Sequence, residues 1–375
     1  MIYIFALSSL MGIFLDCFSK NNTVKKIYIF FLIILFSFLA GSRPNTVPDT
    51  NAYIDYTLYI EKSVSNYGLF YYTEIFEVGF EAITRFLVFL GFNYKNIFFV
   101  IALIIGLLGA ALFNDKKLPI SAWLLFISFY GIYFAFIILR AGLSIVFFAC
   151  FIKHVKRSKM KAILSLVLSF LFHKSMLFAL LIYLVARCFK QKSFKTEMIL
   201  LVCFFIIYIT SLGNYLIVGL INYFDKYIDF SLWNRFVYYL HDFRVGAFNI
   251  SVRLLVNILV YVAARAINKG KKDGYCFTDK LIFAGILINL FLGSNTVVGR
   301  MVDFLLVFNV KNCIVILKAI KNRLVIQAPS TKLMQTNSNT VAMGSVYAID
   351  GGLVRMLLAC SLIIINLFFI IRIIL

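Results

Sequence analysis

A single arginine interrupts a long uncharged stretch of this sequence. Residues 120–152 contain no charged side chain except Arg140. A membrane-spanning helix needs about 20 mostly apolar residues, and a charged group inside such a segment usually faces a cavity or a partner. Basic residues flank the stretch at Lys116 and Lys153. Because Lys and Arg concentrate in cytoplasmic loops, the pattern predicts two crossings, with Arg140 at or just below the far surface.

The composition excludes a soluble globular protein. Of the 375 residues, 62% are hydrophobic and 17% are aromatic, as is typical of a polytopic membrane protein. The net charge of +21 would suggest nucleic acid as a partner of a soluble chain. Here it reflects cytoplasmic loops that fix orientation and contact anionic lipid, so no nucleic acid is expected. The seven cysteines lack metal-binding spacing, which predicts no metal site and no cofactor.

The apolar runs predict an all-α fold of about 12–14 membrane helices in one integral membrane domain, residues 1–375. The predicted spans are 2–16, 27–41, 97–113, 120–136, 138–152, 162–173, 175–189, 198–221, 250–267, 280–294, 301–317 and 356–373. The basic clusters then fall on one side of the membrane. The run 77–92 carries Glu77, Glu81 and Arg85, so we expect an amphipathic or re-entrant helix on the outer side.

The predicted topology leaves segments 42–96, 222–249 and 293–300 on the outer face and a polar segment, 318–355, in the cytoplasm. Lysine dominates the cytoplasmic side. The outer side instead carries arginines 43, 85, 140, 235, 244, 253 and 300. Because the guanidinium fork grips phosphate or carboxylate with two hydrogen bonds, this face is expected to hold an anion such as a phosphate ester.

Two polar motifs lie near the outer surface. Pro44 and Pro48 stiffen the turn that carries Arg43 and Asp49. Asp49 either caps the helix that begins at Thr50 or accepts a hydrogen bond or a proton from a sugar hydroxyl. Further along, Arg300 begins another apolar run, and Asp303 one turn later is a candidate partner for it.

His173 interrupts the apolar stretch 162–189, which the same flanking argument makes a hairpin. The arms are short, so His173 is predicted in a wet cavity level with Arg140. A neutral imidazole there accepts a proton near pH 7, although a hydrogen bond between helices is the alternative. Glu77 and Glu81, four residues apart, serve either glycosyl transfer or pairing with Arg85 or Arg140.

These motifs, in this order, resemble the EpsG/Wzy-type family of bacterial polysaccharide polymerases. The residues that carry the resemblance are Arg43 through Asp49-Thr50 and Tyr53, Glu77-x-Gly79-Phe80, Arg140 before Ala-Gly-Leu-Ser, His173-Lys174-Ser175, and Arg300. The resemblance covers most of 27–317. The family often has Gln after the intramembrane arginine, whereas this chain has Ala141, and the long 324–354 segment also departs from the pattern.

The resemblance implies a glycosyltransferase of O-antigen, capsule or exopolysaccharide synthesis in the bacterial inner membrane, with its site facing the periplasm or exterior. Such proteins transfer a growing glycan from undecaprenyl diphosphate to a single lipid-linked repeat unit. Their fold is similar to that of membrane glycosyltransferases with lipid-phosphate donors. The implied partners are the undecaprenyl-diphosphate-linked oligosaccharide and the bilayer, with a chain-length regulator and a flippase as further candidates.

Three groups of residues fit that chemistry. Arg43, Arg140, Arg244 and Arg300 are the candidates for holding the pyrophosphate. The candidates for accepting the proton of the attacking hydroxyl are Asp49, His173 and Glu77. Tyr53, Trp233 and Tyr238 are the candidate sugar contacts, although aromatic residues also anchor segments at a lipid interface.

Two other functions remain open. A flippase or transporter of the same lipid-linked oligosaccharide would place charges through the depth of the membrane and show internal inverted symmetry, and this sequence shows neither. An O-antigen ligase-like glycosyltransferase would share the arginine-rich outer face.

The polymerase hypothesis predicts that Arg140→Lys fails almost as badly as Arg140→Ala, because a point charge cannot replace the guanidinium fork. The measurement is the glycan chain length made by cells that carry each variant. Full-length glycan from the lysine variant would argue strongly against the hypothesis.

Overall fold

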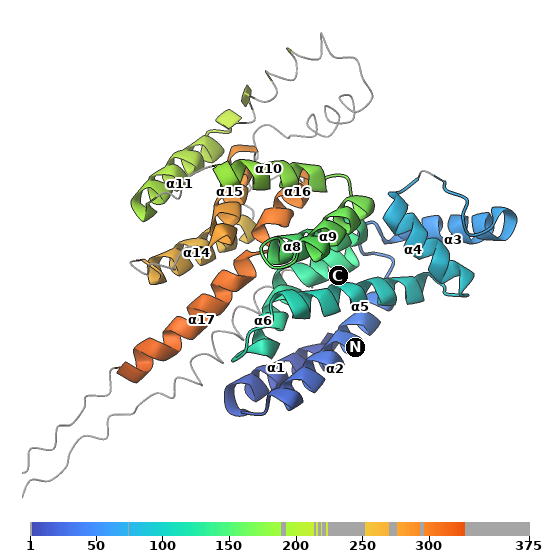
Figure 1. Cartoon of the computed structure of the whole chain (residues 1–375), viewed down its shortest axis with the longest axis horizontal. Coiled ribbons are helices and arrows are strands. Elements are labelled where there is room, and N and C mark those ends of the chain that lie inside the picture. Colours follow the sequence, from blue (N-terminus) through green and yellow to red (C-terminus); the bar gives the residue numbers. More distant parts are fainter. Residues whose placement is uncertain are drawn as a thin grey trace, which may run out of the picture.

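The structure is a computed structural model that describes residues 2–73, 75–188, 193–213, a few positions up to 223, 252–269, 276–292 and 296–326. Within these residues every regular element is helical, and the chain is an all-α polytopic membrane protein (Figure 1). The helices are α1 (Ile2–Phe18), α2 (Asn22–Gly41), α3 (Thr50–Tyr67), α4 (Val78–Phe89), α5 (Tyr94–Leu112), α6 (Pro119–Phe126), η1 (Ile127–Gly131), α7 (Ile132–Phe136), α8 (Leu139–His154), α9 (Lys159–Phe172), α10 (Met176–Cys188), α11 (Phe194–Ile209), α14 (Val252–Ile267), α15 (Phe277–Leu292), α16 (Thr296–Leu306) and α17 (Asn309–Ile326).

Within the described residues, three helical stretches are long and apolar enough to cross a bilayer, namely 22–41, 94–112 and 119–136. The third is the most enclosed, since 94% of its apolar window is buried, against 39% for each of the others. It contains the π-helical turn η1, a distortion that is often found at functional sites. This stretch, α6 to α7, is therefore the centre of the bundle, while α2 and α5 expose apolar side chains as lipid-facing helices do.

The helix breaks at residues 137–138, between α7 and α8, and Arg140 lies in the first turn of α8. The break falls within the stretch 120–152, where the sequence predicts a reversal between two crossings. A hairpin then joins α8 to α9, and it is closed by two serines. The Ser144 hydroxyl donates to the carbonyl of Ser169 (2.7 Å), and the Ser169 hydroxyl donates to the carbonyl of Ser144 (2.8 Å). Small residues of this kind let helices approach closely in membranes.

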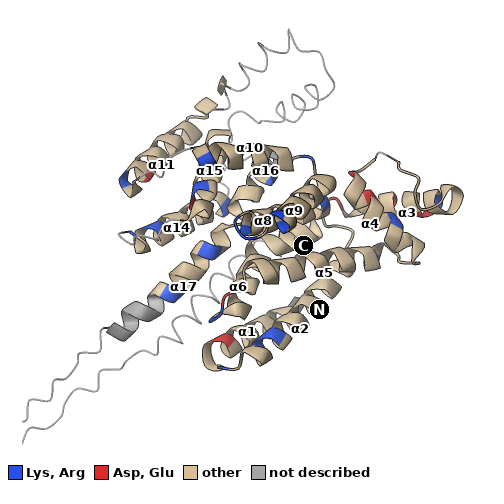
Figure 2. Ribbon diagram, viewed as in Figure 1, with Lys and Arg blue, Asp and Glu red and all other residues tan. Residues whose placement is uncertain are grey.

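Several of the basic residues that were predicted to share one side of the membrane lie at the end of the bundle away from Arg140 (Figure 2). Lys25 is buried beside Asp16 (3.5 Å) and donates to the carbonyl of Lys117 (3.2 Å). Lys318 pairs with Asp115, which brings the middle of α17 to the α5–α6 turn. The turns before α2 and α6 therefore lie together with α17.

One predicted span is wrong. The run 301–317 was expected to be a single helix, but α16 ends at Leu306 and α17 begins at Asn309. The break is stabilised by buried polar groups, since the Tyr130 hydroxyl donates to the carbonyl of Leu306 (2.7 Å) and Asn309 donates to Asn257 (2.9 Å). Breaking the helix leaves backbone polar groups without their partners in the helix, and these side chains provide the hydrogen bonds instead.

A second predicted span is too long. The run 198–221 was expected to be one helix, whereas α11 ends at Ile209 and Ser211 adopts a left-handed conformation with φ of 53°. Such a conformation does not continue an α-helix. The predicted span 356–373 and most of the outer segment 222–249 lie outside the described residues.

Helices α3 and α4 stand together at one side of the molecule (Figure 1), and Glu77, just before α4, binds Arg140. Helix α4 has 12 residues, which corresponds to about 18 Å at 1.5 Å per residue. This is well short of the hydrocarbon core of about 30 Å. The length agrees with the predicted amphipathic or re-entrant helix for 77–92, and Gly91 and Phe92 fall in the turn that follows it.

Candidate functional site

The site begins at the turn between α7 and α8. The Arg140 side chain donates through Nη1 to Oε2 of Glu77, and its guanidinium carbon lies 4.0 Å from the centre of the Phe76 ring. The two partners belong to the segment that precedes α4. Arg140 is 26% exposed, so its charge reaches the surface while one side of the fork is held by protein.

Glu77 also binds His173, which directly follows α9. Its Oε1 lies 2.7 Å from Nδ1 of His173, so a single carboxylate bridges the arginine and the histidine. Both His173 (23% exposed) and Glu77 (11% exposed) are only partly covered. The structure thus brings together three of the predicted site residues and places His173 level with Arg140, as the hairpin argument predicted.

The acidity of Glu77 reflects this position. Burial alone would raise its pKa, but the hydrogen bond from His173 and the charge of Arg140 outweigh burial and lower the pKa to about 2. Glu77 is therefore ionised throughout the physiological range. Glu77 and Glu81, which lie four residues apart, bind different arginines. Glu81 lies inside α4 and binds Arg85 (2.9 Å).

A glycine allows this contact to form. A Cβ atom on Gly79 would lie 2.9 Å from both the carbonyl carbon and the oxygen of Leu171, near the end of α9. Backbone cannot yield at that distance, so only glycine lets α4 approach α9 this closely. The approach sets Glu77, two residues earlier, against His173, two residues after Leu171.

Arg43 is more deeply buried than Arg140 and Arg300. It is 7% exposed, and its Nη1 donates to the carbonyls of Ala135 (3.1 Å) and Phe136 (2.7 Å) at the end of α7. Its guanidinium carbon also lies 3.7 Å from the centre of the Phe98 ring. A cation on the last carbonyls of a helix stabilises that helix end. Arg43 thus fastens the α7 terminus below Arg140, and its predicted contact with phosphate stays a prediction.

Asp49 and Arg300 form a more exposed pair. Oδ2 of Asp49 lies 3.4 Å from Nη2 of Arg300, and the side chains are 44% and 40% exposed. Asp49 precedes α3 with φ of 63°, and its side chain makes no capping hydrogen bond. The simple capping interpretation of Asp49 is therefore wrong, and the carboxylate faces Arg300 instead.

Sequence reasoning missed the role of Arg253 at the start of α14. Asp303 was proposed as a partner of Arg300, but it binds Arg253 with both oxygens, at 2.9 and 3.2 Å. The Arg253 guanidinium carbon lies 4.8 Å from the centre of the Tyr130 ring and 5.0 Å from that of Tyr133. The signal in the sequence was weak, because Arg253 counts among the outer arginines but belongs to no recognisable motif.

Tyr53, a predicted sugar contact, lies close to both Arg43 and Arg140. It is 6% exposed and lies among the rings of Phe76, Phe80 and Phe98. The guanidinium carbon of Arg43 is 5.9 Å from its ring, and Arg140 and Asp49 interact with it electrostatically. Tyr53 therefore lies between the two arginines and is largely covered by protein.

Several arginine N–H groups of this region are buried without a hydrogen-bond partner. They are Nε and Nη2 of Arg43 and the Nε atoms of Arg140, Arg253 and Arg300. Buried donors are nearly always paired in folded proteins, so each such group requires an explanation. An anion with several acceptor oxygens, such as a diphosphate, satisfies donors of this kind.

Three predicted site residues, Trp233, Tyr238 and Arg244, lie outside the described residues. Within the described part of the chain, no group of three His, Cys, Asp or Glu residues is placed to hold a metal ion. The predicted independence from metals and cofactors stays a prediction.

Comparison with known proteins places these residues in a family. The EpsG family matches residues 26–333, a region that contains every site residue described above. No curated protein and no solved structure matches the chain.

The close contact at Gly79 predicts that the effects of substitutions at positions 79 and 77 on stability depend on each other. Gly79→Ala should cost about 1–3 kcal/mol of stability, because its Cβ forces α4 away from Leu171. The same displacement should weaken the bridge from Glu77, so Glu77→Gln should cost less in the Gly79→Ala background than alone. Thermal unfolding of the four proteins in detergent measures both effects, with the neighbouring exposed substitution Val78→Ala as control. Equal costs of Glu77→Gln in the two backgrounds would show that this contact does not position the carboxylate.

The lowered pKa of Glu77 predicts that its contribution to the stability of the fold depends on pH. A carboxylate with a folded-state pKa below its unfolded value stabilises the fold above the unfolded value, and the stabilisation is lost as pH falls. The advantage of the native chain over Glu77→Gln should therefore be present at about pH 5. It should then shrink between the ordinary pKa of 4.5 and about 2. Melting temperatures across this range test it, with Asp55→Asn as an exposed control. A difference that does not change with pH would contradict the bridge.

Proposed function

The chain belongs to the EpsG family, which is associated with polysaccharide polymerisation, and we propose that it joins lipid-linked oligosaccharide repeat units into a polymer. The proposed donor is the growing glycan on undecaprenyl diphosphate. The proposed acceptor is a single repeat unit on a second carrier of the same kind. The observation that supports this most strongly is the group of arginines with unpartnered buried N–H groups beside the Glu77 carboxylate, which also binds His173.

The proposed reaction is a substitution at the anomeric carbon of the donor sugar. A hydroxyl of the acceptor attacks that carbon, so a glycosidic C–O bond forms and the bond to the diphosphate oxygen breaks. The electron pair leaves with undecaprenyl diphosphate, and the hydroxyl proton passes to a protein base. Because a diphosphate is a good leaving group, the main tasks of the protein are to position the substrates and to stabilise charge.

Arg140 and Arg300 are the best placed to stabilise the leaving diphosphate. Both side chains are partly exposed and retain an unpartnered Nε–H. Donors that are fixed in advance stabilise developing charge without reorganisation. Arg253 joins this group in our proposal, whereas the buried Arg43 supports the end of α7 beneath it.

His173 is the proposed base. Its Nδ1 faces Glu77, so the tautomer protonated at Nδ1 presents the lone pair of Nε2 to a substrate hydroxyl. Glu77, whose pKa is about 2, binds protons too weakly to act as the base at neutral pH and instead orients the imidazole. Asp49 faces Arg300, so we propose that it either binds hydroxyl groups of the sugar or positions the Arg300 side chain.

The proposed location is the bacterial inner membrane, with the site facing the periplasm or exterior. The polar contacts of the opposite end, including Lys25 and Lys318, fit the cytoplasmic side because basic residues concentrate there. A chain-length regulator and a flippase are the further partners that this location implies.

Lipid-linked glycans from a deletion strain test the proposal. Loss of the polymerase should accumulate species that carry one repeat unit, and the native gene should restore long chains. His173→Ala should fail to restore them, whereas the exposed neighbouring substitution Lys174→Ala should succeed. Loss of outward-facing repeat units would instead identify a flippase, and full-length polymer retained on its carrier would identify a ligase.

A further inference from the structure

Helix α4 has its charges on the inside and its apolar side chains on the outside. Its two charged residues, Glu81 and Arg85, are 1% and 3% exposed. The exposed positions form a stripe of Val78, Ala82, Phe86 and Phe89, with the three larger side chains 50%, 51% and 63% exposed. A helix on the surface of a soluble domain shows the opposite arrangement.

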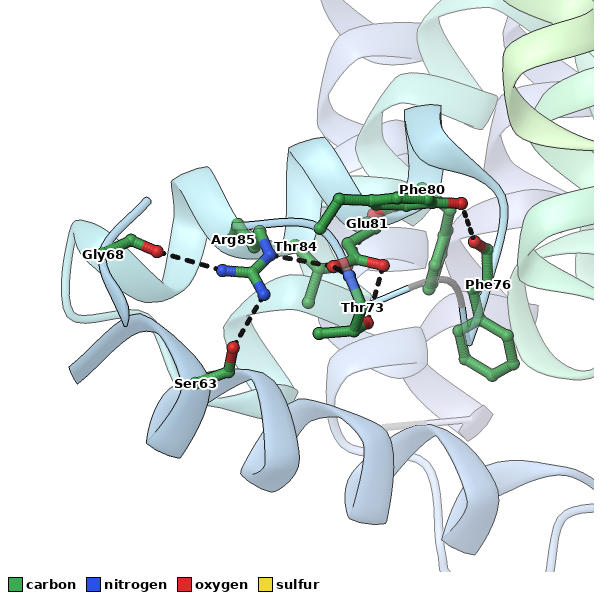
Figure 3. A network of polar contacts seen from close by, with 9 residues as sticks. Ser63, Gly68, Thr73, Phe76, Phe80, Glu81, Thr84 and Arg85 are labelled. Atoms are coloured by element: carbon green, nitrogen blue, oxygen red, sulfur yellow. Dashed lines mark hydrogen bonds and ion pairs between the residues drawn. The ribbon is translucent and has the colours of Figure 1, made fainter. Parts of the chain in front are cut away.

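The two inward-facing charged side chains of α4 bind partners within the protein (Figure 3). Arg85 binds Glu81 (2.9 Å), the hydroxyl of Ser63 on α3 (2.8 Å) and the carbonyl of Gly68 (3.1 Å). Glu81 accepts from the backbone N–H (2.7 Å) and the hydroxyl (2.8 Å) of Thr73. These contacts fasten the loop between α3 and α4 and leave the outer stripe of α4 without any polar side chain.

Helix α3 differs from its partner. Its exposed positions include Asp55, Glu61 and Lys62, which require water. The loop between the two helices exposes Phe70 (96%) and Tyr71 (49%). Aromatic side chains of this kind are enriched where a membrane meets water. The pair therefore has a watery side at α3 and an apolar side at α4.

Both ends of α4 adjoin the part of the bundle around the α7–α8 turn, since Phe98 near the start of α5 lies against Arg43, which binds the end of α7. Its first end adjoins Glu77, which contacts the α7–α8 turn through Arg140. After its last residue the chain turns at Asn93 into α5, one of the stretches long enough to cross the bilayer. A helix too short to span, with both ends beside the same part of the bundle, runs along the membrane surface.

We propose that α4 lies in the interface of the bilayer at the Arg140 end, with the stripe Val78–Ala82–Phe86–Phe89 immersed in lipid. Lipid fits this surface better than a glycan, because sugars need hydrogen-bonding partners and the stripe offers none. Lipid also fits better than water, because an exposed patch of this kind marks a membrane or protein contact. In consequence the bilayer itself holds Glu77, and with it Arg140 and His173, at the level of the lipid headgroups.

Fluorescence of an introduced tryptophan tests this placement. Phe89→Trp and, separately, Phe86→Trp are compared with Tyr59→Trp on the exposed side of α3, in nanodiscs made with or without phospholipid brominated near the headgroup. Native emission is subtracted by using the unmodified chain. The emission added at 89 and at 86 should lose most of its intensity in brominated lipid, and the emission added at 59 should respond to aqueous acrylamide instead.

Two results would overturn the proposal. Quenching of the tryptophan at 89 by acrylamide, but not by brominated lipid, would place the stripe in water. Protection from both quenchers would show that a protein surface, such as a second copy of the chain, covers it. Equal quenching by lipid at positions 59 and 89 would also contradict the assigned orientation of the α3–α4 pair.

Discussion

The bridge that Glu77 makes between Arg140 and His173 is the interaction on which the site depends. It joins three parts of the chain, namely the segment before α4, the start of α8 and the end of α9. A charged arginine near the membrane surface is costly without a partner, and the carboxylate provides one without covering the whole guanidinium. The remaining face of Arg140 stays open to an anion, while the histidine is fixed in one orientation.

The surrounding fold serves to hold this bridge. The interlocked Ser144 and Ser169 align α8 with α9, so that Arg140 and His173 reach the same level. Gly79 brings α4 onto α9 from outside. On the other side of the site, Tyr130 in the π-helical turn binds the carbonyl of Leu306, where α16 ends and the helix that carries Arg300 is broken. The helix break before α8 and the break after Leu306 are thus each satisfied by a polar side chain, Arg43 in the first case and Tyr130 in the second.

The sequence predicts depth in the membrane better than it predicts partners. Basic flanks and apolar lengths place Arg140 and His173 at one level, because bilayer thickness constrains both. Partner choice depends on packing between helices distant in sequence, so the match of Asp303 with Arg253 rather than Arg300 was not foreseen. The break after Leu306 was missed for the same reason, since the asparagines that stabilise it lie within apolar runs.

In the proposed reaction, the arginines around this bridge bind a lipid diphosphate. Purified protein in nanodiscs can be titrated with a short prenyl diphosphate, and with the matching prenyl alcohol as control, while the melting temperature is recorded. The diphosphate, but not the alcohol, should stabilise the native chain, and that stabilisation should be lost in Arg140→Ala and Arg300→Ala. Equal stabilisation of the native chain and both variants by the diphosphate would contradict it.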